Sequence, residues 1–258
     1  ALALCLKDDG GFDHNAQALK VVTALERRYP DFDGLNLTWE TLEGLVKHNG
    51  PLISDDGTPL PSVKTKTVPQ DILDFERLFP LALSDHAGLE AQVAALADDI
   101  AYNTHDIDDG LRAGLFAIDE LREIPFLSVI LNDIDRQWPT LEIARRIHEL
   151  ERRLITRFVE GVIRQGQEAL KPFTTADVDD VRKAGKTLVR FPDDLSEADR
   201  GIKKFLFARM YRSPSVMRIR TDAERVVTDL FSAYDTDLNN LPADWRTGLE
   251  TGDRLQKR

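Results

Sequence analysis

Three residues within one predicted helix could bind a cation or the hydroxyl groups of a ligand. Asp98, Tyr102 and Asp106 follow one another at intervals of four residues, so a helix places them along one face. Carboxylate oxygens are preferred ligands of hard divalent cations, and a phenol adds a hydroxyl group beside them. The same spacing is equally compatible with a solvated acidic face, so both interpretations stay open at this point.

The segment that contains these residues has no basic side chain. No Lys or Arg occurs between Leu78 and Leu111, whereas this segment carries Asp85, Glu90, Asp98, Asp99, Asp106, Asp108 and Asp109. Like charges one helical turn apart repel each other, so we expect a cationic group to face the segment. The candidates are a bound metal ion and the arginines of a later helix, at positions 145, 146, 152 and 153.

Two further positions could contact an anion. His14 stands at the start of a predicted helix, where a histidine can bind an anion beside free backbone N–H groups; a surface or capping role is the more common one. The segment 203–212 combines basic and aromatic residues, so Lys203 could contact a phosphate. Most of that segment is expected to be an ordinary amphipathic helix, which leaves Lys203 and Tyr211 as the residues in question.

The spacing of hydrophobic residues predicts that the chain is almost entirely helical. Helices should therefore position the residues named above. Thr38 is expected to cap a helix that ends at His48-Asn49-Gly50-Pro51, and a proline separates two late helices at Ser213-Pro214. The segment 51–68 is predicted to be a surface loop, and 187–191 a short strand. The other helices are predicted over residues 13–28, 70–78, 87–109, 111–122, 141–170, 175–183, 197–212 and 214–234.

The composition of the 258 residues indicates a globular protein. With 42% hydrophobic and 31% charged residues, the chain can bury a core, which excludes disordered, collagen-like and membrane-spanning proteins. The net charge of −11 means that an anionic substrate would need metal ions or local Lys and Arg. Cys5 is the single cysteine, which excludes an internal disulfide and is typical of a reducing compartment. We therefore expect a cytoplasmic protein without membrane contact.

Several blocks of sequence resemble one family. Asp13-His14-Asn15-Ala16-Gln17, the block 34–51, the block 89–102 and the helix break within 205–216 are similar to deoxyguanosinetriphosphate triphosphohydrolase-like proteins of the HD-domain phosphohydrolase superfamily. The block 35–51 is long and specific, and the resemblance extends from about Phe12 to the end. It implies an all-α, HD-type helical fold with little or no β structure, in a single domain over residues 1–258.

The resemblance also implies an activity and roles for the residues above. Such proteins hydrolyse deoxynucleoside triphosphates to the deoxynucleoside and inorganic triphosphate with a divalent metal ion, for which Mg²⁺, Mn²⁺ and Co²⁺ are the candidates. By resemblance, Asp98 is a metal ligand and His14 a catalytic proton donor near the α-phosphate. The implied substrate-binding residues are Tyr102 and Asp106 at the deoxyribose, Tyr211 near the sugar or base, and Lys203 at the phosphates. Homo-oligomers and a nucleotide effector are implied as well.

The sequence departs from the family pattern in its metal ligands. The family has a first metal-binding histidine and then a His-Asp doublet before the metal aspartate, and none of the five histidines of this chain fits these positions. The doublet His105-Asp106 follows Asp98 instead of preceding it. We therefore expect that the chain lacks native N-terminal and C-terminal segments. Two alternatives stay open: another HD-type nucleotide phosphohydrolase, and a non-catalytic nucleotide-binding or structural subunit.

Overall fold

The computed structural model describes residues 1–60, 67–173 and 177–246. Within these ranges, the regular elements are helices, and the β structure is an isolated antiparallel bridge between Ile53 and Pro59. The all-α fold class predicted from the sequence is thus confirmed. None of the helices in the described ranges is both long enough and apolar enough to cross a membrane.

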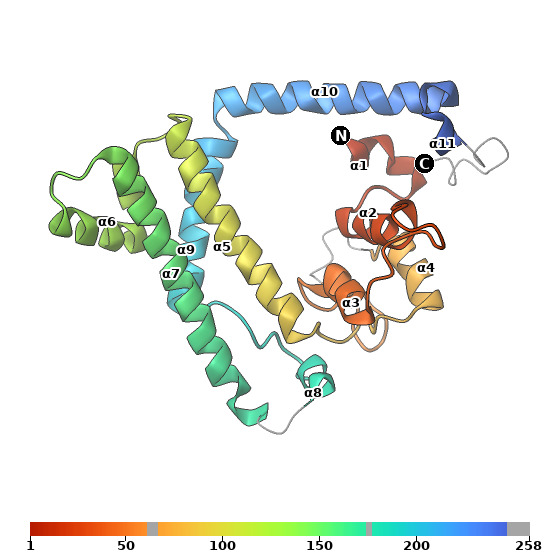
Figure 1. The fold of residues 1–258 in the computed structure, drawn as a ribbon, viewed down its shortest axis with the longest axis horizontal. Coiled ribbons are helices and arrows are strands. Elements are labelled where there is room, and N and C mark those ends of the chain that lie inside the picture. Colours follow the sequence, from red (N-terminus) through yellow and green to blue (C-terminus); the bar gives the residue numbers. More distant parts are fainter. Residues whose placement is uncertain (61–66, 174–176, 247–258) are drawn as a thin grey trace.

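One end of the molecule, which we call the first lobe, is formed by N-terminal helices (Figure 1). They are α1 (Leu2–Cys5), α2 (His14–Lys20) with the π-helical turn η2 (Val21–Leu25), α3 (Trp39–Lys47) and α4 (Gln70–Leu78). The Asp13 carboxylate caps α2 by accepting from the Ala16 amide over 2.9 Å, and Thr38 caps α3 as predicted. The buried hydrophobic residues of this lobe are Ala16, Leu19, Leu42, Val46, Val68, Ile72, Leu81 and Leu83.

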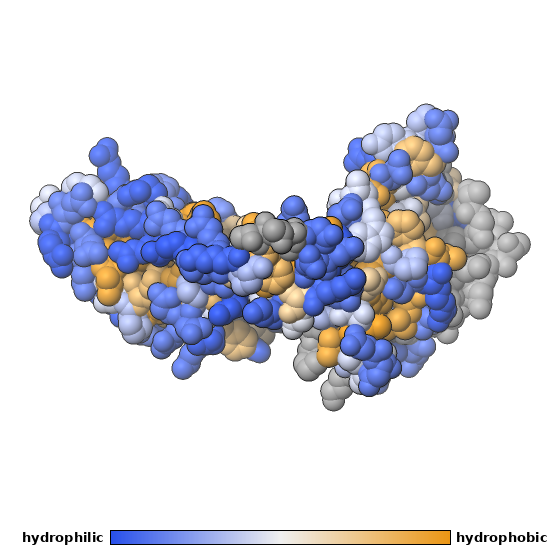
Figure 2. Space-filling model, turned by 90° about the horizontal axis from the view of Figure 1, so that it is seen from below, coloured by the Kyte–Doolittle hydropathy of each residue, from blue (hydrophilic) through white to orange (hydrophobic). Residues whose placement is uncertain are grey.

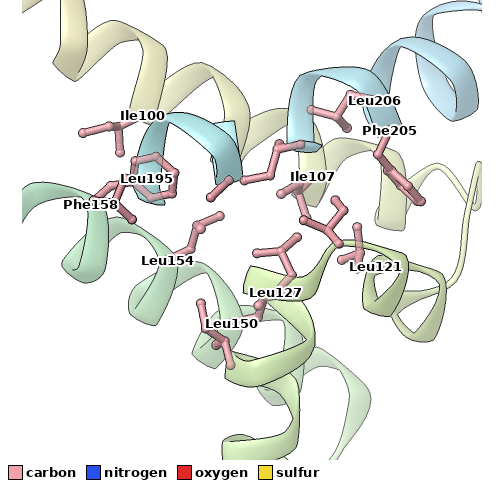
Figure 3. Close-up of a cluster of buried hydrophobic side chains, with 14 of the residues drawn as sticks. Ile100, Ile107, Leu121, Leu127, Leu150, Leu154, Phe158, Leu195, Phe205 and Leu206 are labelled. Carbon is pink, nitrogen blue, oxygen red and sulfur yellow. The ribbon is translucent and has the colours of Figure 1, made fainter. Parts of the chain in front are cut away.

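The second lobe is built around the long helix α5 (Leu89–Arg112), which packs against α7 (Ile143–Leu170) and α9 (Asp193–Leu206). The short helix η3 (Ile118–Glu123) and α6 (Pro125–Gln137) cover α7, and α8 (Val178–Arg182) lies before α9. Figure 3 shows how side chains from these helices meet in one cluster. Its labelled members are Ile100, Ile107, Leu121, Leu127, Leu150, Leu154, Phe158, Leu195, Phe205 and Leu206.

The C-terminal elements run between the two lobes. After the π-helical turn η5 (Phe207–Tyr211), α10 (Pro214–Thr236) crosses from the end of α9 towards the first lobe and contacts α1 (Figure 1). The turn η6 (Leu238–Asn240) and α11 (Ala243–Arg246) follow. The space-filling view shows a narrow middle between two bulkier ends, with hydrophobic side chains visible on the surface of both (Figure 2).

A buried ionic network joins the lobes. Glu43 of α3 accepts hydrogen bonds from Arg182 of α8 over 3.0 and 3.1 Å and from Lys47, whose ammonium lies 3.1 Å away. The Lys47 ammonium also donates to the Ala82 carbonyl over 2.8 Å. Burial lowers the pKa of Lys47, against the opposing effect of Glu43. The Arg182 guanidinium lies 4.5 Å from the centre of the Trp39 ring. A cation–π contact with Trp39 thus adds to the ion pair with Glu43.

Several predicted elements differ from the structure. No strand forms over 187–191, because the Leu188 and Val189 amides donate to the Gln92 side chain over 2.8 and 3.0 Å instead of to a neighbouring strand. The helix predicted over 111–122 is also wrong: α5 ends at Arg112, Gly114 takes a positive φ of 65°, and η3 begins at Ile118. The prediction also omitted α6. Part of the predicted loop 51–68 and of the predicted helix 175–183 lies outside the described residues.

Candidate functional site

The facing sides of α5 and α9 bring together residues that are about one hundred positions apart in the chain. The ammonium of Lys203 lies 2.9 Å from the Asp99 carboxylate of α5 and 3.1 Å from the Asp199 carboxylate of its own helix. Burial disfavours the charged ammonium, but the hydrogen bonds to the two carboxylates outweigh that effect and raise the pKa of Lys203. Lys203 is therefore a charged group held between two acids.

A buried amide orients one of those acids. The Asn103 side chain donates to Asp199 over 2.7 Å, and both residues are buried. The side-chain oxygen of Asn103 has no partner within the described part of the chain. A buried polar group costs free energy unless it forms a hydrogen bond. The hydrogen bond from Asn103 therefore holds the Asp199 carboxylate in place, and Asp199 in turn positions Lys203.

A second pair forms one helical turn beyond Asn103. The phenol of Tyr211, in η5, donates a hydrogen bond to the Asp106 carboxylate of α5. Burial, with a further contribution from the Asp109 carboxylate, raises the pKa of Asp106. A carboxylate with a phenol beside it can accept a hydrogen bond from a ligand hydroxyl and offer a ring surface next to it.

The remaining residues predicted on α5 are exposed. Asp98 and Tyr102 lie on the same helix as Asp106, as the spacing predicted, and Tyr102 keeps 56% of its surface exposed. Within the described residues, neither Asp98 nor Tyr102 forms a hydrogen bond or an ion pair. Their side chains are thus available for a ligand, whereas those of Asp106 and Lys203 are already engaged by protein groups.

His14 lies apart from these residues in the structure. It is the first residue of α2, in the first lobe, and its side chain is exposed. No hydrogen bond or ion pair in the described ranges connects it to α5 or α9. Its assignment as the catalytic proton donor stays a prediction from resemblance.

The described residues do not form a metal centre. No group of three or more His, Cys, Asp or Glu side chains that could hold a metal ion occurs among them. Asp98 alone offers one exposed carboxylate, whereas Mg²⁺ and similar ions need an octahedral set of oxygen ligands. The residues present therefore do not fit a metal ion on their own.

The base-free segment is faced by a cation from an unexpected helix. Lys203 of α9 pairs with Asp99, and Arg112 at the end of α5 pairs with Asp108. The alternative that the arginines of α7 pair with this segment is wrong. Arg146 binds Asp135 and Asp119, and the other three bind the acids next to them on α7 or its cap: Arg145 binds Glu142, and Arg152 and Arg153 bind Glu149.

Sequence reasoning missed three residues of this cluster. They are Asp99, which is one acid among seven in the base-free segment, Asp199, and Asn103, which no sequence pattern distinguishes. A usable signal existed for Asp199, because Lys203 follows it by four residues, the spacing of a helical ion pair. The spacing gave no indication that Asn103 contacts Asp199, since 96 residues separate them.

A cavity of about 710 Å³ lies elsewhere, beside α2, η2 and α11. It is lined by Gln17, Val21, Leu25, Glu26, Arg27, Arg28 and Trp245. The Arg27 guanidinium lies 5.8 Å from the centre of the Trp245 ring, and Arg28 pairs with Glu26 over 3.1 Å. The site residues predicted from the sequence are not part of its wall.

Comparison with known proteins gives consistent relatives. Residues 189–258 match the phosphohydrolase-associated domain. Curated proteins named deoxyguanosinetriphosphate triphosphohydrolase-like protein match nearly the whole chain. The one from Allorhizobium ampelinum is 51% identical over 97% of this chain and 62% of its own length. The one from Rhodopseudomonas palustris strain BisB18 is 53% identical over 100% of this chain and 65% of its own length. The one from Rhizobium johnstonii is 55% identical over 87% of this chain and 55% of its own length.

The chain thus spans between 55% and 65% of the length of these three relatives. The matches nevertheless extend over almost all of the chain, with an overall identity of about one half. The matched domain covers the helices that carry Lys203 and Tyr211. The resemblance to deoxyguanosinetriphosphate triphosphohydrolase-like proteins that the sequence predicted is thus confirmed along almost the whole chain.

Proposed function

We propose that the chain forms the substrate-binding part of a hydrolase that cleaves deoxynucleoside triphosphates into the deoxynucleoside and inorganic triphosphate. The observation that supports this most directly is the α5–α9 cluster, in which Tyr211 meets Asp106 and Lys203 lies between Asp99 and Asp199. The resemblance implies sugar-binding roles for Asp106 and Tyr211 and a phosphate-binding role for Lys203. Relatives with about 50% identity carry the name of a triphosphohydrolase-like protein.

In this proposal, each group has one task. The Asp106 carboxylate and the Tyr211 and Tyr102 phenols bind the deoxyribose, because they offer acceptors and donors for a sugar hydroxyl on one side of α5. Lys203 turns from its carboxylates to the triphosphate, whose charge is the stronger attraction. Hydrolysis replaces the bond between the α-phosphorus and the 5′ oxygen by a bond to the oxygen of water. The leaving 5′ oxygen takes a proton, which His14 would supply.

The proposal includes a dependence on a divalent cation. Asp98 would be one ligand, and the others would come from outside the described residues, since those residues do not form a metal site. The two lobes would then belong to one HD-type helical domain that polypeptide outside the chain completes. Homo-oligomers and a nucleotide effector belong to the same proposal.

The test is the identity of the products. The purified protein is incubated with each of the four deoxynucleoside triphosphates and Mg²⁺, Mn²⁺ or Co²⁺, and the products are separated by anion-exchange chromatography. Inorganic triphosphate together with the deoxynucleoside supports the proposal. Release of orthophosphate or pyrophosphate would instead identify another kind of nucleotide phosphohydrolase.

One observation favours a second candidate function, a nucleotide-binding subunit without catalysis. The described residues lack a complete set of metal ligands, although the side chains that would bind sugar and phosphate are present. Calorimetric titration separates the two functions: binding of a deoxynucleoside triphosphate without any turnover supports the second candidate. Absence of both binding and turnover would contradict both.

A further inference from the structure

The helix α10 is long, apolar on one side and not buried by the rest of the chain. None of its 23 residues, all of which the structure describes, is buried. Four of its large hydrophobic side chains are markedly exposed: Ile219 by 69%, Val226 by 51%, Leu230 by 50% and Tyr234 by 38%. In proteins, most of the stability of a helix comes from packing an apolar face against a partner.

The apolar residues of α10 form one continuous stripe. We define the α10 stripe by Val216, Ile219, Val226, Val227, Leu230 and Tyr234. At about 100° per residue, these six positions fall within an arc of roughly 100° around the helix axis. The opposite side carries Thr221, Thr228 and Ser232, which are all exposed and polar. The helix is therefore amphipathic, and its apolar side is not buried by the part of the chain that the structure describes.

The width of the stripe indicates the kind of partner. A two-stranded coiled coil uses a narrow seam of two positions in seven, whereas a helix that packs onto a globular body has a stripe of about 100°. The α10 stripe has the second form. It therefore favours packing onto a folded protein surface over pairing with α10 of a second copy.

The lengths of the relatives indicate where that surface comes from. The chain covers 62% of the Allorhizobium ampelinum relative and 65% of the Rhodopseudomonas palustris relative, so more than a third of each has no counterpart here. The match nevertheless includes α10, since it extends over 97% and 100% of this chain. Those relatives thus contain both an equivalent of α10 and additional polypeptide that could cover it.

We propose that the α10 stripe is an interaction surface for the additional polypeptide found in these longer relatives, which packs an apolar surface of its own against α10. This inference concerns folding and assembly and does not depend on the proposed activity. It is tested by amide hydrogen exchange and by molecular mass, neither of which depends on turnover. Its failure is therefore distinguishable from failure of the proposed function.

Hydrogen exchange of the α10 amides tests the proposal in intact proteins. The probe is the complete Allorhizobium ampelinum relative, compared with the 258-residue chain. The equivalent α10 peptides should exchange on the order of 100-fold more slowly in the relative than in the chain, because packing suppresses local opening. Equally fast exchange in both proteins would overturn the proposal.

Matched variants show whether the stripe is the surface involved. Ile219→Glu, Val226→Glu and Leu230→Glu are combined at the aligned positions of the relative, and Thr221→Glu, Thr228→Glu and Ser232→Glu form the control with the same number of introduced carboxylates. The stripe variant should lose the slow exchange and the control should keep it. Slow exchange that survives the stripe variant contradicts the proposal.

The same substitutions in the 258-residue chain test the competing occupant, a second copy. Because the three stripe residues are exposed, these changes should leave the helical circular dichroism of the chain intact. Light scattering at micromolar concentration should give the same mass for the unmodified chain and its stripe variant. A dimer of the unmodified chain that the stripe variant abolishes would show that α10 pairs with itself, and would overturn the proposal.

Discussion

The guanidinium group of Arg182 donates two parallel hydrogen bonds to the carboxylate of Glu43, over 3.0 and 3.1 Å, and both side chains are buried. The two residues are 139 positions apart and belong to α8 and α3. Because the same carboxylate also compensates Lys47, one acid holds two buried cations. The ionic contact between α3 and α8 is thus centred on a single carboxylate.

Glu43→Gln should therefore be strongly destabilising. The amide keeps the shape of the side chain, but it removes the ion-pair partner of Lys47 and leaves Arg182 paired with the exposed Asp179. Removal of one member of a buried ion pair costs about 3–5 kcal/mol. The free energy of unfolding in urea measures this cost. Glu224→Gln, which removes an exposed partner of Arg220, is the control and should change stability by no more than about 0.5 kcal/mol. Similar values for the two variants would contradict the role of Glu43.

Two helical glycines should respond in opposite ways to alanine. A Cβ atom at Gly110 would lie 2.3 Å from the Phe116 ring, whereas one at Gly166 would lie 4.0 Å from Val189. Gly110→Ala should destabilise the protein by about 1–3 kcal/mol through overpacking. Gly166→Ala should stabilise it by up to about 1 kcal/mol through helix propensity. Thermal unfolding of the two variants checks both signs, and a stabilising Gly110→Ala would show that Phe116 moves without cost.

The raised pKa of Asp106 predicts a pH dependence of stability. Burial holds the pKa of this carboxyl above its ordinary value of 3.8 in the folded state, so the folded state binds the proton more tightly than the unfolded state. The contribution of Asp106 to stability is then fully present below pH 3.8 and is lost as the pH rises through the folded-state pKa. The stability of the wild type relative to Asp106→Asn should fall across that window in urea titrations. A difference that is independent of pH, or that rises with pH, would contradict the assignment.

Substitutions around Lys203 should change the affinity for a triphosphate. Lys203→Met removes a charged hydrogen bond, which is worth about 1.5–3 kcal/mol, so the affinity for a deoxynucleoside triphosphate should fall by roughly tenfold or more. Asp99→Asn should raise the affinity, because it frees the ammonium from one carboxylate. Lys204→Met, at the exposed neighbouring residue, is the control. Isothermal titration calorimetry measures all three, and equal losses at positions 203 and 204 would contradict the role of Lys203.

The sequence predicted best those elements whose boundaries are encoded locally. The helix over 70–78, the Thr38 cap and the break at Ser213-Pro214 all appear in the structure, because each depends on a residue next to the boundary. Helix α6 was missed even though Pro125 stands in its first turn and Leu127, Ile130, Leu131 and Ile134 are spaced for a buried face. Both signals are local, so the sequence encodes α6 as clearly as it encodes the elements above.

The errors and omissions arise where distant residues decide the outcome. The residues 187–191 have the composition of a strand, but Gln92 accepts from two of their amides, and helical spacing carries no information on such a contact. The helical face of Asp98, Tyr102 and Asp106 was predictable from intervals of four. The contacts of α5 with Lys203 and Tyr211 could not be predicted, because they depend on α9 packing against α5 and join residues about one hundred positions apart.

The excess of acidic residues on α5 affects the rate at which a polyanion can bind to this helix. The helix carries six carboxylates and one guanidinium, and the ammonium of Lys203 is already compensated by Asp99 and Asp199. A triphosphate therefore approaches this face against a repulsive field. Raising the ionic strength screens that field, so association of the nucleotide should become faster with added salt, which is the reverse of the behaviour of proteins that attract their ligands electrostatically.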